Sequence, residues 1–164
     1  MGNVKPVGNL AGLRPAQLEA IQRLYRRRID PNKVTTLELA QAMCKISADC
    51  NRQVGVFVNR RGEVTTVIVG DTERLELPDV GRKRAGEARL RGTRLLHTHV
   101  KGESLTEDDL TDLSLLSFDC IVAFTITDEG RPDKAHMAHL LPENPEQKLW
   151  EIHPATAVHE LDID

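Results

Sequence analysis

Apolar residues in the first fifty positions recur at the spacing of amphipathic helices. A first helix is predicted to begin near Pro15, because the opening turn of a helix tolerates proline, and to end at residues 30–32. Its apolar positions are Leu18, Ile21, Leu24 and Ile29. A second helix is predicted from Thr35 to about Cys50, because Thr35 and Glu38 have the spacing of a capping box.

The period then changes to that of extended strands rich in β-branched residues. Residues 54–58 and 64–69 flank the turn Arg60-Arg61-Gly62 and predict a β-hairpin. Further strands are predicted over 94–97, 120–126 and 134–141.

These elements predict an α/β fold with a mixed sheet of about five strands and helices packed on its faces. A third helix, capped by Ser104 or Thr106, is predicted after the 94–97 strand. The predicted organisation is a flexible lead-in at 1–13, a single α/β domain over 14–142 and a C-terminal tail at 143–164.

The composition indicates a globular protein of the cytoplasm. Of the 164 residues, 40% are hydrophobic and 29% are charged, which is enough material for one core. No apolar run approaches the ~18 residues of a membrane span, and the start lacks the apolar stretch of a signal peptide. The three cysteines form no C-x-x-C pair, which fits a reducing compartment. We therefore expect a cytoplasmic location and no membrane partner.

The chain lacks the usual pattern for binding GTP. A phosphate-binding loop has the pattern G-x-x-x-x-G-K-[ST], whose backbone amides and lysine hold the phosphates. No glycine in this sequence is followed by lysine. The sequence therefore predicts no nucleotide-binding residues.

The segment from His97 to Asp109 holds the densest group of metal-ligating residue types. His97 and His99 are two positions apart, so on a strand both side chains point to the same face. Asp109 adds a third ligand, the number found in catalytic zinc sites. Three interpretations stay open: a strand end closed by hydrogen bonds to Asp109, which we favour, a bound zinc ion, or zinc catalysis. By contrast, His136 and His139 are predicted to face opposite sides of their strand.

The same segment resembles the JAMM/MPN metalloprotease pattern, in which H-x-H is followed by seven residues, a serine, two residues and an aspartate. Thr106 and Asp109 keep the spacing of that serine and aspartate, but the gap after His99 is one residue shorter. The resemblance implies a JAMM/MPN-like fold, with the layering of cytidine deaminases, and a zinc-binding hydrolase or a metal or ligand sensor. The glutamate base of that family has no counterpart in residues 51–53, Asn-Arg-Gln, so we expect no catalytic residues.

Two clusters of basic residues are candidate contacts for RNA or for a partner. The net charge of −3 argues against a dedicated nucleic-acid binder, but local clusters occur within that total. One cluster ends the first predicted helix with Arg23, Arg26, Arg27 and Arg28, and the other consists of Arg82, Lys83, Arg84, Arg89, Arg91 and Arg94. Arginine forks bind phosphate in a salt-sensitive way, and the alternative is a solvated surface.

Several runs along the chain together resemble the long N-terminal extension of some HflX-type ribosome-associated GTPases. In order, they are residues 8–13 (GNLAGL), 24–28 (LYRRR), 52–56 (RQVGV), 61–64 (RGEV), 67–71 (VIVGD), 89–94 (RLRGTR), 97–99 (HTH), 108–113 (DDLTDL) and 138–142 (AHLLP). The resemblance implies a noncatalytic regulatory or ribosome-contacting domain. It also implies two partners, the large ribosomal subunit and the GTPase domain of the same protein, and only that GTPase domain would bind GTP and Mg²⁺. Dimerisation through a strand edge is a third possible role.

Overall fold

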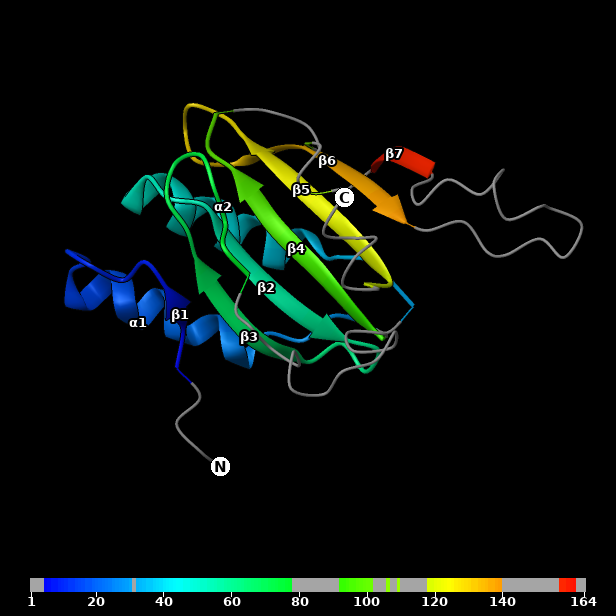
Figure 1. Cartoon of the computed structure of the whole chain (residues 1–164), viewed down its shortest axis with the longest axis horizontal. Coiled ribbons are helices and arrows are strands. Elements are labelled where there is room, and N and C mark those ends of the chain that lie inside the picture. The colour runs from blue at the N-terminus through cyan, green and yellow to red at the C-terminus, as the bar shows by residue number, and fades with distance from the viewer. Residues whose placement is uncertain are drawn as a thin grey trace, which may run out of the picture.

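The computed structural model describes residues 5–30, 32–77, 92–101, 106, 109 and 118–139, together with the backbone of 157–161. In this part of the chain the strands form one mixed sheet in the order β1-β3-β2-β4-β5-β6-β7 (Figure 1). The pairs β1–β3 and β4–β5 are parallel, and the other neighbours are antiparallel. The strands are β1 (Val7–Gly8), β2 (Val54–Asn59), β3 (Val64–Val69), β4 (Thr93–His99), β5 (Cys120–Ile126), β6 (Pro132–His139) and β7 (Ala157–Leu161). The α/β class is confirmed.

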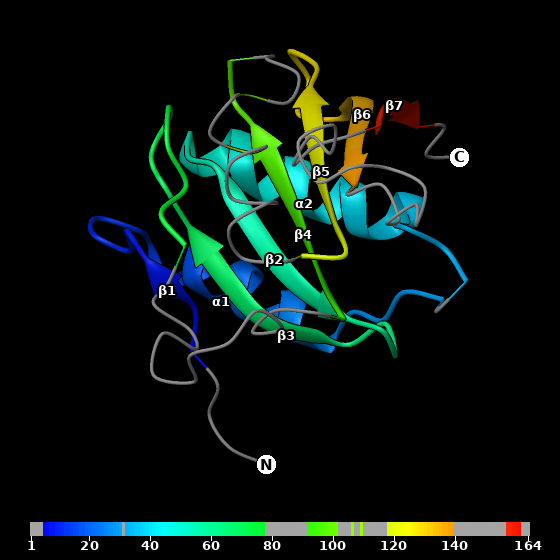
Figure 2. The same ribbon diagram turned by 45° about the vertical axis from the view of Figure 1, so that its right-hand side comes forward.

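Two helices pack on one face of the sheet, as Figures 1 and 2 show. Helix α1 (Pro15–Arg23) begins at the predicted proline, and α2 (Leu37–Cys50) ends where the sequence predicted. The N-cap of α2 is Thr36 rather than Thr35, because the Thr36 hydroxyl accepts a hydrogen bond from the Leu39 amide. Glu38 therefore lies too early in the helix to complete the predicted capping box.

The first helix is shorter than the sequence predicted. After Arg23 the chain tightens into a 3-10 turn, η1 (Leu24–Arg26), and then becomes extended. The Ile29 amide donates to the carbonyl of Gly62, and Arg28 forms a β-bridge with Glu63. This backbone pairing with the β2–β3 turn replaces the helical hydrogen bonds, although Ile29 still occupies a core position.

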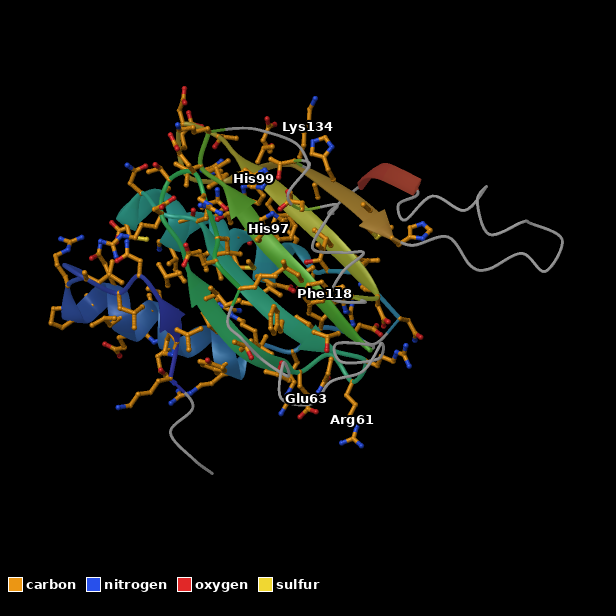
Figure 3. All side chains as sticks on the ribbon, viewed as in Figure 1. Arg61, Glu63, His97, His99, Phe118 and Lys134 are labelled. Carbon is orange, nitrogen blue, oxygen red and sulfur yellow. The ribbon has the colours of Figure 1, made fainter. Side chains whose placement is uncertain are left out.

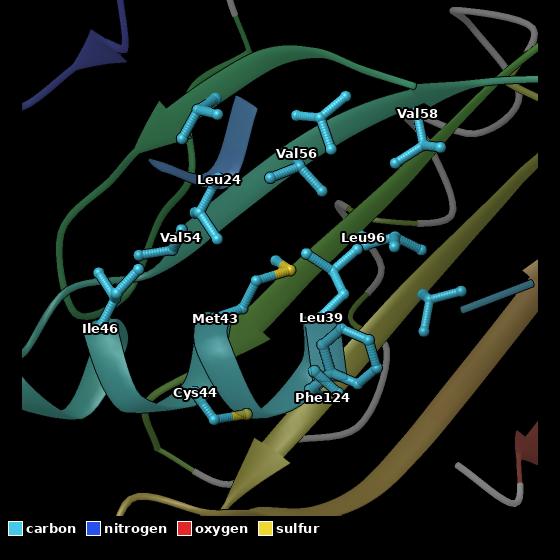
Figure 4. Packing of buried hydrophobic residues seen from close by; sticks show 14 of the residues in the cluster. Leu24, Leu39, Met43, Cys44, Ile46, Val54, Val56, Val58, Leu96 and Phe124 are labelled. Carbon is cyan, nitrogen blue, oxygen red and sulfur yellow. The ribbon is translucent and has the colours of Figure 1, made fainter. Parts of the chain in front are cut away.

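The sheet has an apolar core on each face. On the helix face, Leu39 and Met43 of α2 pack toward Val56 and Leu96 of the central strands (Figure 4). On the other face, a smaller cluster includes Phe57 and Phe118, whose rings meet edge to face at 5.4 Å. The central strands β2, β4 and β5 are thus buried on both sides, which explains their nearly continuous apolar sequence.

Two strands lie in segments where the sequence predicted no element, so the sheet has seven strands rather than about five. β1 lies in the predicted lead-in and β7 in the predicted tail. The lead-in is held partly by Arg52, whose guanidinium donates to the carbonyls of Asn9 and Ala11. The two residues of β1 are too few to show a period-two pattern. Most of the helix predicted after β4 lies outside the described residues.

Candidate metal centre

His97 and His99 lie near the end of β4, on the sheet face opposite the two helices. Between them Thr98 faces α2, because its hydroxyl contacts Ser47 of that helix. Figure 3 shows the two histidines side by side on β4. Their side chains are only 1% and 5% exposed, and their Nε2 atoms are 2.9 Å apart. The i, i+2 spacing in the sequence thus brings two ring nitrogens together in a buried position, as predicted.

Asp109 completes the group from the segment that follows β4. Its carboxylate oxygens lie 3.0 Å from Nε2 of His97 and 3.3 Å from Nε2 of His99. Asp109 is oriented by Thr106: the Thr106 amide donates to the carboxylate, and the Asp109 amide donates to the Thr106 hydroxyl. These reciprocal bonds are those of a capping box with Thr106 as the capping residue, one of the two predicted; the other, Ser104, lies outside the described residues. The three predicted ligands therefore converge, with all ligand atoms within 4.8 Å of one another.

The surroundings keep Asp109 ionised. Burial by itself raises the pKa of a carboxyl group, but here that effect is outweighed. The charge and hydrogen bond of His97, the hydrogen bond of His99 and the amide of Thr106 together hold the pKa of Asp109 well below its usual range. The site therefore presents an anionic oxygen beside two imidazole nitrogens.

The separations are close to those of a tetrahedral zinc site. Zinc binds histidine nitrogen and carboxylate oxygen at about 2.0–2.2 Å, which places two ligand atoms of a tetrahedron about 3.3–3.5 Å apart. The three observed separations are 2.9, 3.0 and 3.3 Å, so outward shifts of a few tenths of an ångström would admit the ion. The donor set, two imidazoles and one carboxylate, also suits zinc and leaves a fourth position for water.

Small residues flank His97 in the sheet. Its neighbours in register are Gly55 on β2 and Ala123 on β5. A Cβ atom at Gly55 would lie 2.6 Å from the Leu75 side chain and 3.5 Å from Cβ of His97. The glycine therefore lets Leu75 pack against the sheet beside the histidine. Sequence analysis missed these two flanking positions, because small residues in a strand gain this meaning only once the register is known.

Within the described residues, the segment at the start of β2 offers no carboxylate to act as a base. Asn51 ends α2 in the left-handed conformation, with φ 52°, and Arg52 binds the carbonyls of the N-terminal segment. Gln53 is buried, and the alternation along β2 places it on the histidine face. A glutamine side chain donates and accepts hydrogen bonds but does not titrate as a base.

Arg94 lies largely inside the fold rather than on an exposed basic surface, unlike the prediction for that residue. It is 9% exposed and points to the helix face, where its guanidinium donates to the carbonyls of Lys33 and Val34. In the first cluster, Arg23 pairs with Glu19 at 2.8 Å and Arg28 with Glu63 at 2.7 Å. The other residues of the second cluster, Arg82, Lys83, Arg84, Arg89 and Arg91, lie outside the described residues.

The prediction that His136 and His139 face opposite sides of their strand agrees with the strand pairing. His136 lies beside Ala123 of β5 and therefore on the same face as His97, two strands away. Alternation along β6 puts His139 on the opposite face.

Comparisons of the chain with known protein families, with curated proteins and with solved structures found no match. In the described part of the chain, no helix is long and apolar enough to span a membrane.

Proposed function

We propose that this chain is a zinc-binding domain without hydrolytic activity, in which His97, His99 and Asp109 hold the ion. One observation carries the proposal: two buried Nε2 atoms and one carboxylate meet at mutual distances of 2.9–3.3 Å. If each histidine donates its Nε2 proton to Asp109, the two N–H groups face each other at 2.9 Å. If one donates to the other, the acceptor Nε2 carries no proton and the donor's Nε2 proton is already used, so none remains for the carboxylate. A cation that accepts all three lone pairs removes this conflict.

The bound ion would supply Lewis acidity and a water in the fourth position. Thr106 would hold the Asp109 carboxylate in place, and the buried strand β4 would fix the two rings. General acid–base help is worth roughly 10²–10⁴ in rate, and the described segment before β2, where the JAMM/MPN pattern would carry its glutamate base, has the buried amide side chain of Gln53 instead. The arrangement therefore favours a structural or sensing role for the ion over hydrolysis.

Elemental analysis after zinc incubation and desalting tests this proposal. We expect one zinc per chain in the natural protein and none in the double variant His97→Ala, His99→Ala. The matched control is His136→Ala, His139→Ala, which removes two histidines of the same sheet and should retain the ion. Circular dichroism of each variant establishes that it is folded. A folded double variant that keeps its zinc, or a natural protein that binds none, contradicts the proposal and leaves hydrogen bonding to Asp109 as the role of the histidines.

We further propose that the domain has a regulatory role next to a GTPase and contacts the large ribosomal subunit, as the resemblance to HflX-type extensions implies. The contact would rely on Arg82, Arg84, Arg89 and Arg91, since Arg94 is used inside the fold. Co-sedimentation with large subunits should then weaken as salt is raised and after charge reversal at those four residues. Charge reversal at Arg61 and Arg131, both exposed, is the control and should have little effect. Binding that is insensitive to both salt and the four reversals would contradict this role.

A further inference from the structure

Thr98, the residue between the two histidines, is connected to the opposite side of the sheet. Its hydroxyl is completely buried, accepts a hydrogen bond from the Val54 amide at 2.9 Å and donates to the Ser47 hydroxyl at 2.8 Å. Ser47 is equally buried and donates in turn to the carbonyl of Arg52. The hydroxyls of Thr98 and Ser47 thus form a chain of hydrogen bonds from the Val54 amide to the Arg52 carbonyl.

This chain of bonds links three elements at the level of the metal centre. Ser47 lies in the last turn of α2, Arg52 in the loop that follows it, and Val54 at the start of β2. The Val54 amide is directed at a side chain of β4, so the Thr98 hydroxyl takes the place of a backbone acceptor at the end of the β2–β4 ladder. On the β2 side, the register ends at the Gly55–His97 pair, so this side-chain bond continues the link between β2 and β4 next to the histidines, while β5 pairs with β4 as far as His99.

We infer that Thr98 and Ser47 are positioning residues for the proposed zinc site, holding the rings of His97 and His99 in place relative to Asp109. This inference rests on the proposed function. The physical reason is that side chains alternate along a strand, so Thr98 faces the helices while His97 and His99 face the proposed zinc site. Any rotation of β4 at Thr98 therefore moves both histidine rings together. Metal affinity depends on the orientation of the ligand side chains, and loss of the contacts that hold those side chains in place typically lowers the affinity 10–100-fold.

The test compares Thr98→Val, which keeps the shape of the side chain but removes the hydroxyl, with Thr98→Ser, which keeps the hydroxyl. Ser47→Ala is a second variant, which breaks the link to α2 and leaves the Val54–Thr98 bond in place. The matched control is Thr125→Val. Thr125 is also buried and lies beside His99 in register, but its hydroxyl serves the backbone of Lys134 on β6.

The first readout is the binding of zinc and of Co²⁺, whose visible absorption reports the coordination geometry. We expect Thr98→Val and Ser47→Ala to bind zinc about tenfold more weakly and to show an altered Co²⁺ spectrum. Thr98→Ser and Thr125→Val should stay within about twofold of the natural protein and keep its spectrum. A role in stability alone would lower the melting temperature of Thr98→Val without changing the spectrum of the folded, loaded protein.

The second readout needs no metal. The ring-nitrogen chemical shifts of His97 and His99 in the metal-free protein should change in Thr98→Val and return to their natural values in Thr98→Ser. If the natural protein binds no metal, the proposed function fails, and the ring shifts still decide whether Thr98 positions the histidines. Thr98→Val with natural ring shifts, or with natural metal affinity and spectrum, overturns the inference. Equal changes in Thr125→Val overturn it as well, since they would reflect local packing only.

Discussion

Replacing Arg94 tests whether this residue belongs to the fold rather than to a nucleic-acid surface. Arg94→Met keeps most of the aliphatic stem but removes the guanidinium that binds the carbonyls of Lys33 and Val34. Two hydrogen bonds from a charged donor are worth about 3–6 kcal/mol together. Removing the charge also recovers part of its desolvation cost, which is several kcal/mol for a buried ion. We therefore expect a net loss of about 2 kcal/mol in the free energy of unfolding.

Urea denaturation with a fluorescence or circular-dichroism readout measures this loss, which should appear as a lower midpoint at an unchanged m value. For a chain of this size, 2 kcal/mol corresponds to a fall in Tm of roughly 4–8 °C. The control is Arg61→Met at an exposed position, where we expect a change within about 0.5 kcal/mol. An Arg94→Met protein as stable as this control would refute the assignment of Arg94 to the fold and return it to the set of candidate RNA contacts.

Three further predictions concern the fold around the site. Gly62→Ala should lower the free energy of unfolding, measured by urea denaturation, by about 3 kcal/mol or more. The reason is that φ of Gly62 is +82° and a Cβ atom there would lie 1.8 Å from the carbonyl oxygen of Ile29. A loss below about 1 kcal/mol would contradict this. Tyr25→Phe should cost about 1–3 kcal/mol at pH 7, since it leaves the Val67 amide without its phenol partner. Burial raises the pKa of Tyr25 above 10. The stability that its hydroxyl contributes is therefore complete below pH 10 and declines as the pH rises through the folded-state pKa. A difference in the free energy of unfolding between the natural protein and Tyr25→Phe that widens above pH 10 would contradict this. Cys44 should resist alkylation in the native protein at pH 8, because burial raises the pKa of its thiol to about 12, and mass spectrometry should detect its labelling only after unfolding.

The local elements were predictable where they follow one dominant pattern. The bounds of β3 and β5 and the end of α2 agree with the predictions, because alternation, β-branched density and helical spacing each point to one structure there. The first helix was predicted to be too long, because its apolar period continues to Ile29 although the backbone there pairs with the turn at Gly62. A contact between segments more than thirty residues apart leaves no trace in the local pattern.

The sequence by itself determined the three candidate ligands. Two histidines at i and i+2 must share a face once they lie on a strand, and Asp109 follows them as a third ligand type on the predicted helix. Only the tertiary structure decided that these three side chains meet at about 3 Å, that Arg94 is buried, and that Ser47 and Thr98 connect the histidines to α2. The physical reason is that alternation and capping are local properties of the backbone. Strand register and helix docking, in contrast, depend on how all the apolar surfaces pack together.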